Sequence, residues 1–135
     1  MKITQETDYA FRITSFLASH ENEIIGAPII AEECSVTERF TLRILRKLNL
    51  AGITYAKRGA KGGYGLKRPK EEITLYQIIC AIEGPTVINR CLAHDHYCNR
   101  KTIEGVKHCK FHSKLFHIQK SIINMFNSET IDNYI

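Results

Sequence analysis

The sequence predicts a mainly α-helical fold with one small β-hairpin and a long C-terminal helix. Apolar residues recur at helical spacing in several segments, two short strand-like runs flank a glycine-rich turn, and a last apolar series has a heptad-like spacing. With 135 residues, the chain is long enough for one domain with a hydrophobic core and a helical extension. Its 44% apolar and 24% charged residues are typical of a soluble globular protein.

The first three expected helices lie close together in the chain. Thr4 is placed to cap a helix that runs to about His20, and a shorter helix occupies about 27–34. Thr37 then caps a third helix, which ends near Leu50.

The third helix is expected to have two different faces. Its apolar residues, predicted to face the core, are Phe40, Ile44, Leu45 and Leu48. Its outer face carries arginines at positions i, i+4 and i+7, namely Arg39, Arg43 and Arg46.

Two short strands are expected after this helix, over Ile53–Lys57 and Tyr64–Lys67. The turn between them, Arg58-Gly59-Ala60-Lys61-Gly62-Gly63, contains glycines that supply the positive φ needed in a tight hairpin. A helix, a turn, a helix and a basic hairpin follow one another in the order of a winged helix-turn-helix.

Positive charge is concentrated in these elements. Ten of the nineteen Lys and Arg residues lie between Arg39 and Lys70, a stretch without Asp or Glu, although the whole chain carries only +5. Such a stretch favours double-stranded DNA over a protein as the partner of this surface. The base-edge candidates are Thr37, Arg39 and Arg43, the backbone anchors are Arg46 and Lys47, and the minor-groove candidates are Lys57, Arg58 and Lys61.

The C-terminal part predicts self-association. A helix is expected from about Thr74 to Glu83 and another from about Val106. Apolar residues in the last helix are spaced four, three, four and three apart, at Phe111, Leu115, Ile118, Ile122 and Met125, and are flanked by Phe116, Ile123 and Phe126. This spacing favours a homodimer contact over packing on the same domain. We therefore expect a DNA-binding domain over 1–84, a cysteine-rich loop over 85–110, and a dimerisation helix with a C-terminal tail over 106–135.

The loop before the last helix combines Cys91, Cys98 and Cys109 with four of the six histidines. Thiolates and imidazoles are the ligands that hold iron–sulfur clusters or zinc, and His112 would complete a zinc set. A metal-free thiol switch is a further alternative. Cys34 and Cys80 lie within apolar helical patterns and are expected to be buried.

Other classes of protein fit less well. The polar N-terminal residues lack the apolar centre of a signal peptide, and no segment reaches the roughly 18 apolar residues of a membrane span, so a cytoplasmic location without a membrane partner is expected. A Cys–His nucleophile is formally possible. It would leave the basic stretch and the heptad-spaced helix unexplained, so we do not expect an enzyme.

Several segments carry a resemblance to a known family. They are Met1-Lys2-Ile3-Thr4 with Thr7-Asp8-Tyr9-Ala10-Phe11-Arg12, Ile44-Leu45-Arg46-Lys47-Leu48 with Ala51-Gly52-Ile53, and Arg58-Gly59-Ala60-Lys61-Gly62-Gly63-Tyr64. Together with the three-cysteine loop and the terminal helix, they resemble the IscR/NsrR-type bacterial transcriptional regulators over essentially the whole chain.

The resemblance implies a homodimeric repressor that binds a pseudo-palindromic operator and senses redox state, nitric oxide or iron–sulfur status. It implies a 2Fe-2S or 4Fe-4S cluster held by Cys91, Cys98 and Cys109. His112 matches the fourth ligand of the two-iron branch, and Asp8 matches that of the four-iron branch, so both stay open. The spacing Cys-x6-Cys-x10-Cys has a longer second gap than either branch.

Overall fold

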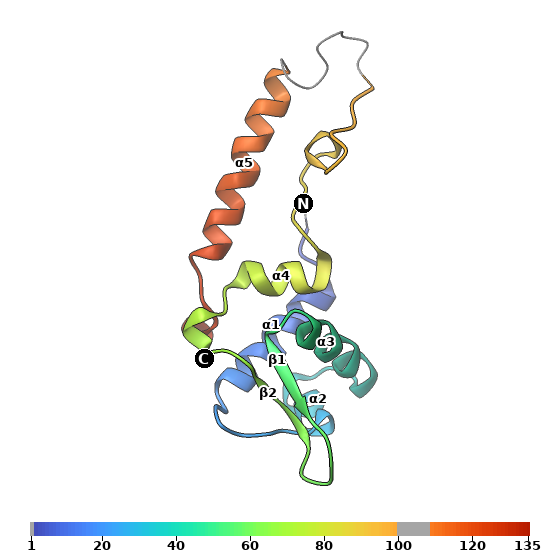
Figure 1. Ribbon diagram of the computed structural model, residues 1–135, viewed down its shortest axis with the longest axis vertical. Coiled ribbons are helices and arrows are strands. Elements are labelled where there is room, and N and C mark those ends of the chain that lie inside the picture. The colour runs from blue at the N-terminus through green and yellow to red at the C-terminus, as the bar shows by residue number, and fades with distance from the viewer. Residues whose placement is uncertain (1, 100–108) are drawn as a thin grey trace.

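The computed structural model describes residues 2–99 and 109–135 of the chain. Within these residues, the helices and the hairpin follow in the expected order (Figure 1). The helices are α1 (Gln5–Ala18), α2 (Ala27–Cys34), α3 (Glu38–Leu50), α4 (Leu75–Glu83) and α5 (Lys110–Asn127). The strands are β1 (Thr54–Lys57) and β2 (Gly63–Leu66), and the short 3-10 helices are η1 (Lys70–Glu72), η2 (Arg90–Leu92) and η4 (Ile131–Tyr134). The predicted fold class is confirmed.

Local sequence explains where the first helices begin and turn. The hydroxyl groups of Thr4 and Thr37 accept hydrogen bonds from the backbone N–H groups of Thr7 and Phe40, so both threonines cap their helices as expected. Ser35, which follows α2, adopts the left-handed conformation with φ 56° and redirects the chain towards α3. The helices α2 and α3 thus form the helix-turn-helix, which packs on α1.

The core lies between these helices and α4. Ile44, Leu45 and Leu48 of α3 are fully buried, as predicted, in a cluster that includes residues of α1 and α4. The prediction for Phe40 was wrong, because its side chain is 39% exposed. Phe40 lies in the first turn of α3, where Tyr9 packs against it edge to face with ring centroids 6.0 Å apart and leaves the rest of the ring in solvent.

The wing, which comprises β1, β2 and the turn between them, is an antiparallel hairpin. Its register pairs Thr54 with Leu66 and Lys57 with Gly63, and the ends of both strands lie within one residue of the expected ends. An isolated bridge joins Tyr64 to Ile25, with backbone N–O distances of 3.0 and 2.8 Å. The bridge seats the turn end of β2 on the loop between α1 and α2.

The C-terminal tail returns to the domain, which the sequence did not predict. Ile131 of η4 is fully buried in the main core, and its backbone N–H donates to the carbonyl of Ile73 at 2.9 Å. The hydroxyl of Ser15 in α1 donates to the carbonyl of Tyr134 at 2.6 Å. The residues that follow α5 therefore hold its C-terminal end against the domain, through contacts with Ile73 and with α1.

Residues 85–99 and α5 form an arm that extends from the domain in Figure 1. Cys109 is the N-cap of α5, and the residues before it, where a start near Val106 was expected, lie outside the described part of the chain. All of α5 is described, and none of its side chains is fully buried. In the described residues, no helix has the length and hydropathy to cross a membrane.

Candidate DNA-binding surface and cysteine pocket

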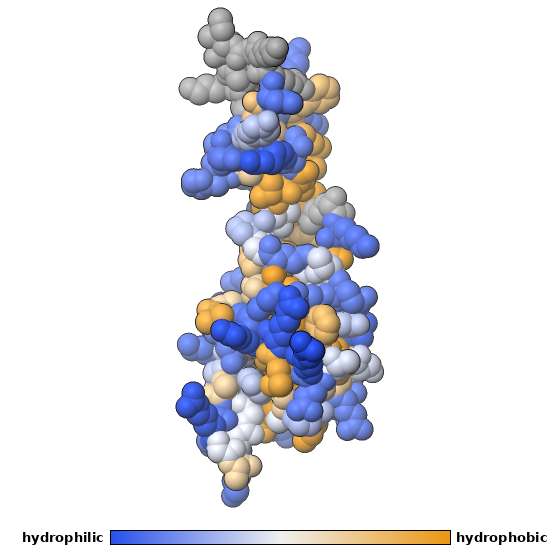
Figure 2. Space-filling view, turned by 90° about the vertical axis from the view of Figure 1, so that its right-hand side faces the viewer, coloured by the Kyte–Doolittle hydropathy of each residue, from blue (hydrophilic) through white to orange (hydrophobic). Residues whose placement is uncertain are grey.

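The outer face of α3 presents the predicted residues to solvent. Thr37, Arg39, Arg43 and Arg46 are all exposed. Figure 2, which faces the side where α3 lies, shows strongly hydrophilic side chains across the middle of the molecule. The Thr37 oxygen already accepts the Phe40 N–H at 3.2 Å, so its hydroxyl hydrogen and one lone pair are left for a ligand.

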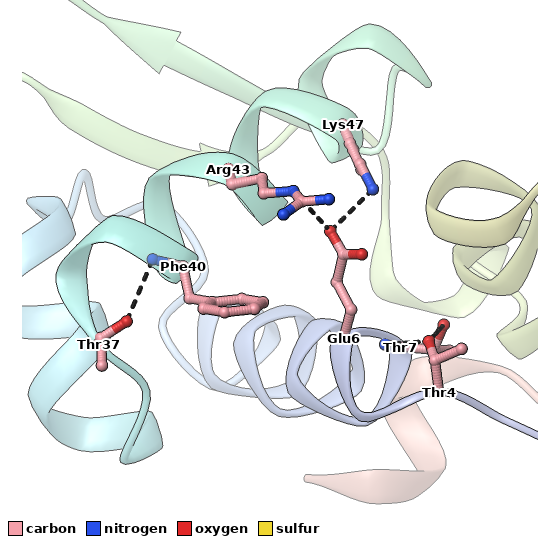
Figure 3. Close-up of polar contacts among 7 residues, drawn as sticks. All are labelled: Thr4, Glu6, Thr7, Thr37, Phe40, Arg43 and Lys47. Atoms are coloured by element: carbon pink, nitrogen blue, oxygen red, sulfur yellow. Dashed lines mark hydrogen bonds and ion pairs between the residues drawn. The ribbon is translucent and has the colours of Figure 1, made fainter.

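Lys47 lies in a different environment from these arginines. Its side chain is half-buried, and its ammonium donates to the carboxylate of Glu6 at 2.8 Å (Figure 3). Arg43 contacts the same carboxylate oxygen at 3.5 Å. Glu6 was not predicted as a site residue, because a contact over 41 residues leaves no local signal in the sequence.

The basic residues of the wing lie around its turn. Lys57 ends β1, Arg58 and Lys61 lie in the turn, and all three are exposed. The turn is tight, since a Cβ atom at Gly62 would lie 2.2 Å from the carbonyl oxygen of Lys57. The wing tip extends beyond the helices in Figures 1 and 2.

The cysteines of the arm gather around one pocket. Cys91, Cys98, Cys109 and His112 line a cavity of about 250 Å³, which we call the cysteine pocket. The other residues of its lining are Asn89, Arg90, Tyr97, Asn99 and Phe111. Within the described residues, no three His, Cys, Asp or Glu side chains lie close enough to hold a metal ion as they stand.

Hydrogen bonds to sulfur connect the two sides of the cysteine pocket. The ring nitrogen Nδ1 of His112 lies 3.3 Å from Sγ of Cys91, and the side-chain amide of Asn89 donates to the same sulfur at 3.2 Å. Sγ of Cys109 accepts the backbone N–H of His112 at 3.5 Å. The first turn of α5 and η2 therefore meet at Cys91.

A charged pair shapes the segment between Cys91 and Cys98. Two guanidinium nitrogens of Arg90 hydrogen-bond to the two carboxylate oxygens of Asp95, one of them at 2.6 Å, and the guanidinium lies 5.0 Å from the ring centroid of Tyr97. The hydrogen bonds from Arg90 lower the pKa of Asp95 to about 2. This ion pair, which was not predicted, joins the two ends of the short segment from Arg90 to Asp95.

The two candidate fourth ligands have different surroundings. His112 lines the cysteine pocket, whereas Asp8 is not part of its lining. The carboxylate of Asp8 instead accepts a hydrogen bond from Arg12 at 2.7 Å on α1. Of the loop histidines, His94 and His96 are exposed, and His108 lies outside the described residues.

Comparison with known proteins identifies the family to which the chain belongs. Residues 3–135 match the model of Rrf2, described as an iron-dependent transcriptional regulator. The chain belongs to the Rrf2 family. It is accordingly a transcriptional regulator with a DNA-binding fold, and not an enzyme.

Two relatives illustrate the Rrf2 match. The chain is 29% identical over 110 residues to the HTH-type transcriptional regulator NsrR of Bacillus licheniformis, which covers 80% of this chain and 77% of that regulator. It is 34% identical over 91 residues to protein aau3 of Rhizobium meliloti. The second match covers 67% of this chain and spans only 59% of the relative.

Solved structures share the Rrf2 fold. The T. potens IscR structure has a TM-score of 0.74 at 23% identity, covering 99% of this chain and 85% of that one. The structure of CymR, the global cysteine regulator of B. subtilis, has a TM-score of 0.76 at 21% identity, covering 99% and 95%. At these identities, both comparisons bear on the fold alone.

Proposed function

We propose that this Rrf2 protein is a homodimeric repressor whose operator affinity is controlled by an iron–sulfur cluster. In this proposal, residues 1–84 bind DNA, 85–110 hold the cluster, and 106–135 dimerise. The single observation that carries the cluster assignment is the common pocket of three thiols and one imidazole. This donor set matches the ligands of iron–sulfur clusters.

Cys91, Cys98 and Cys109 would hold the cluster, with His112 as the fourth ligand. His112 is favoured over Asp8 because it lines the cysteine pocket and already contacts Cys91. When bound, such a cluster supplies a redox-active centre with one ligand that is weaker than cysteine.

The arm offers a route from the cysteine pocket to DNA. Cys91 belongs to η2, which follows α4 in the chain. Cys109 and His112 belong to the start of α5. Shared ligation would fix these two segments to one another, and the backbone N–H of Ile88 already donates to Gln119 of α5 at 3.0 Å. Because α5 belongs to the proposed dimer contact, a change in the arm would move the two recognition helices relative to one another. Dimeric readers need their half-sites about one helical turn apart, so this movement would alter operator affinity.

The cluster is tested by anaerobic purification with iron and sulfide analysis and visible absorption. We expect coloured protein, and we expect His112→Ala to lose or shift the absorption bands, while His117→Ala, a matched exposed histidine on α5, does not. Bands lost only in Asp8→Ala would assign the fourth ligand to Asp8. Colourless protein with bound zinc would replace the cluster with a structural zinc site.

The sensing function needs a DNA measurement. An operator is first selected from random duplex DNA, and its affinity is then measured with and without the cluster. A change of about tenfold or more, equivalent to about 1.4 kcal/mol, is expected for a two-state sensor. Equal affinities would exclude control by the cluster.

The DNA surface is tested separately. Arg46→Ala and Arg58→Ala should weaken operator binding and reduce the slope of log K against log salt by about one each. Lys114→Ala, which removes an equal charge from α5, should leave both unchanged. Full affinity in both arginine variants would refute this surface.

A metal-free thiol switch is the second candidate. The oxidised form of Staphylococcus aureus CymR has a related structure, with a TM-score of 0.70 at 25% identity. Cys91 is only half-buried and lies in the cysteine pocket with Cys98 and Cys109, so we expect oxidation to begin at this sulfur. This candidate predicts iron-free protein whose operator binding responds reversibly to diamide and dithiothreitol.

A further inference from the structure

Glu6 joins α1 to the DNA-facing side of α3. Its side chain is only 18% exposed, and its Oε1 atom accepts from Nζ of Lys47 at 2.8 Å and lies 3.5 Å from Nε of Arg43 (Figure 3). One carboxylate outside the helix-turn-helix therefore neutralises part of the charge of two cations on the surface assigned to DNA.

The arrangement around Glu6 is well ordered by its neighbours. The cap at Thr4 fixes the first turn of α1, in which Glu6 lies, and Thr7 one residue later is fully buried. On the other side, the guanidinium of Arg43 lies 5.9 Å from the ring centroid of Phe40. Arg43 is thus held between a carboxylate and an aromatic ring, both of which restrict its orientation.

We propose that Glu6 is a positioning residue that sets the specificity of DNA binding. By pairing with Lys47 and Arg43, it weakens their attraction to phosphates, because a phosphate must compete with the carboxylate for each cation. The same pairing presents Arg43 in a defined orientation for base contacts. The proposal rests on the assignment of α3 to DNA in the proposed function.

The test is Glu6→Gln, which keeps the length of the side chain and removes its charge. We expect affinity for non-operator duplex DNA to rise about threefold to tenfold, with a salt slope steeper by about one, because at least one cation becomes available to phosphate. Affinity for the operator should rise less, so that discrimination between the two DNAs falls. Salt slope and discrimination are readouts that a merely structural role would leave unchanged.

Glu72→Gln provides the matched control. It makes the same change in net charge at an exposed position of η1, on the opposite side of the domain from α3 in Figure 1. We expect it to change non-operator affinity by less than about twofold, since distant exposed charges are largely screened. An equal rise in both variants would overturn the proposal, because net charge alone would then explain the effect.

A double variant isolates the pair. In a Lys47→Met background, Glu6→Gln should give a clearly smaller increase in salt slope than it gives in the wild-type chain. If Glu6→Gln proves unfolded by circular dichroism, Glu6→Asp takes its place, since a shorter side chain loosens the same contacts and must act in the same direction.

The outcomes separate this inference from the proposed DNA surface. Unchanged non-operator affinity and slope in the folded Glu6 variant, together with a weakened Arg46→Ala, would overturn the role of Glu6 alone. If Arg46→Ala and Arg58→Ala also bind DNA normally, the DNA surface itself is wrong and the role of Glu6 falls with it.

Discussion

Cys34 and Cys91 have the same side chain but differ in burial, and we therefore expect them to differ in reactivity. Cys34, the last residue of α2, is buried in the main core, and this burial raises its pKa from 9.0 to about 11. Cys91 is half-buried in the cysteine pocket. Because an unfolded chain would ionise Cys34 near pH 9 while the folded chain keeps it protonated up to about 11, stability falls as pH rises through this range.

Timed alkylation at pH 8 should separate the cysteines of reduced, cluster-free protein. The pKa near 11 lowers the thiolate fraction of Cys34 about 100-fold relative to a thiol of pKa 9, and burial slows access further. We expect iodoacetamide to modify Cys91 well before Cys34, as followed by mass spectrometry of peptides. In urea the two should react alike. Equal rates in the folded protein would contradict the assigned burial.

Residues whose role depends on local pattern were predictable, and those whose role depends on distant partners were not. The buried positions Ile44 and Leu48 follow from helical spacing. Phe40 fits the same spacing, but its exposure depends on how far α1 reaches across the first turn of α3. Cys80, expected to be buried like Cys34, is only half-buried. Glu6 acquires its role only when folding brings it to Lys47.

At the scale of elements, helix starts are the best-predicted features, because the signals that set them are local. Thr4 and Thr37 cap the expected helices, and Thr74 forms a reciprocal capping box with Gln77. The return of Ile131 to the core had no such signal. Its short apolar segment carries no helical period, and its burial depends on a partner nearly 60 residues earlier in the chain, at Ile73.

The seating of the wing can be tested at Gly63. A Cβ atom there would lie 2.5 Å from the carbonyl oxygen of Ile25, so the bridge to Tyr64 would have to shift. We expect Gly63→Ala to lower the free energy of unfolding by about 1–3 kcal/mol in urea titrations, the usual cost of overpacking. It should also weaken operator binding. Ala60→Ser, an exposed change in the same turn, is the control, and equal stability of the two variants would contradict this seating.

At the scale of the whole molecule, the described part of the arm has a largely exposed apolar side. Phe111 and Met125 are each 69% exposed, and both belong to the stripe predicted from the heptad spacing. Beside the lower half of α5, a cavity of about 670 Å³ is lined mainly by apolar residues: Ile3, Leu75, Ile122, Met125 and Phe126, with Ser128, Glu129 and Tyr134. Exposed apolar surface of this kind marks an interaction site, here proposed for a second copy of the chain.

The homodimer is tested by placing a charge on the stripe. Ile118 is 40% exposed on α5, so Ile118→Glu should leave the protomer folded. In a dimer the new carboxylate would be buried without a partner at a cost of about 3 kcal/mol, which weakens association about 100-fold. Sedimentation over a range of concentrations measures this shift, and Ser121→Glu, an exposed position of the same helix outside the stripe, is the matched control. Operator affinity should fall with dimerisation, since one recognition helix reads only one half-site. A monomeric wild-type chain, or an Ile118→Glu variant that associates like wild type, would show that the stripe serves another partner.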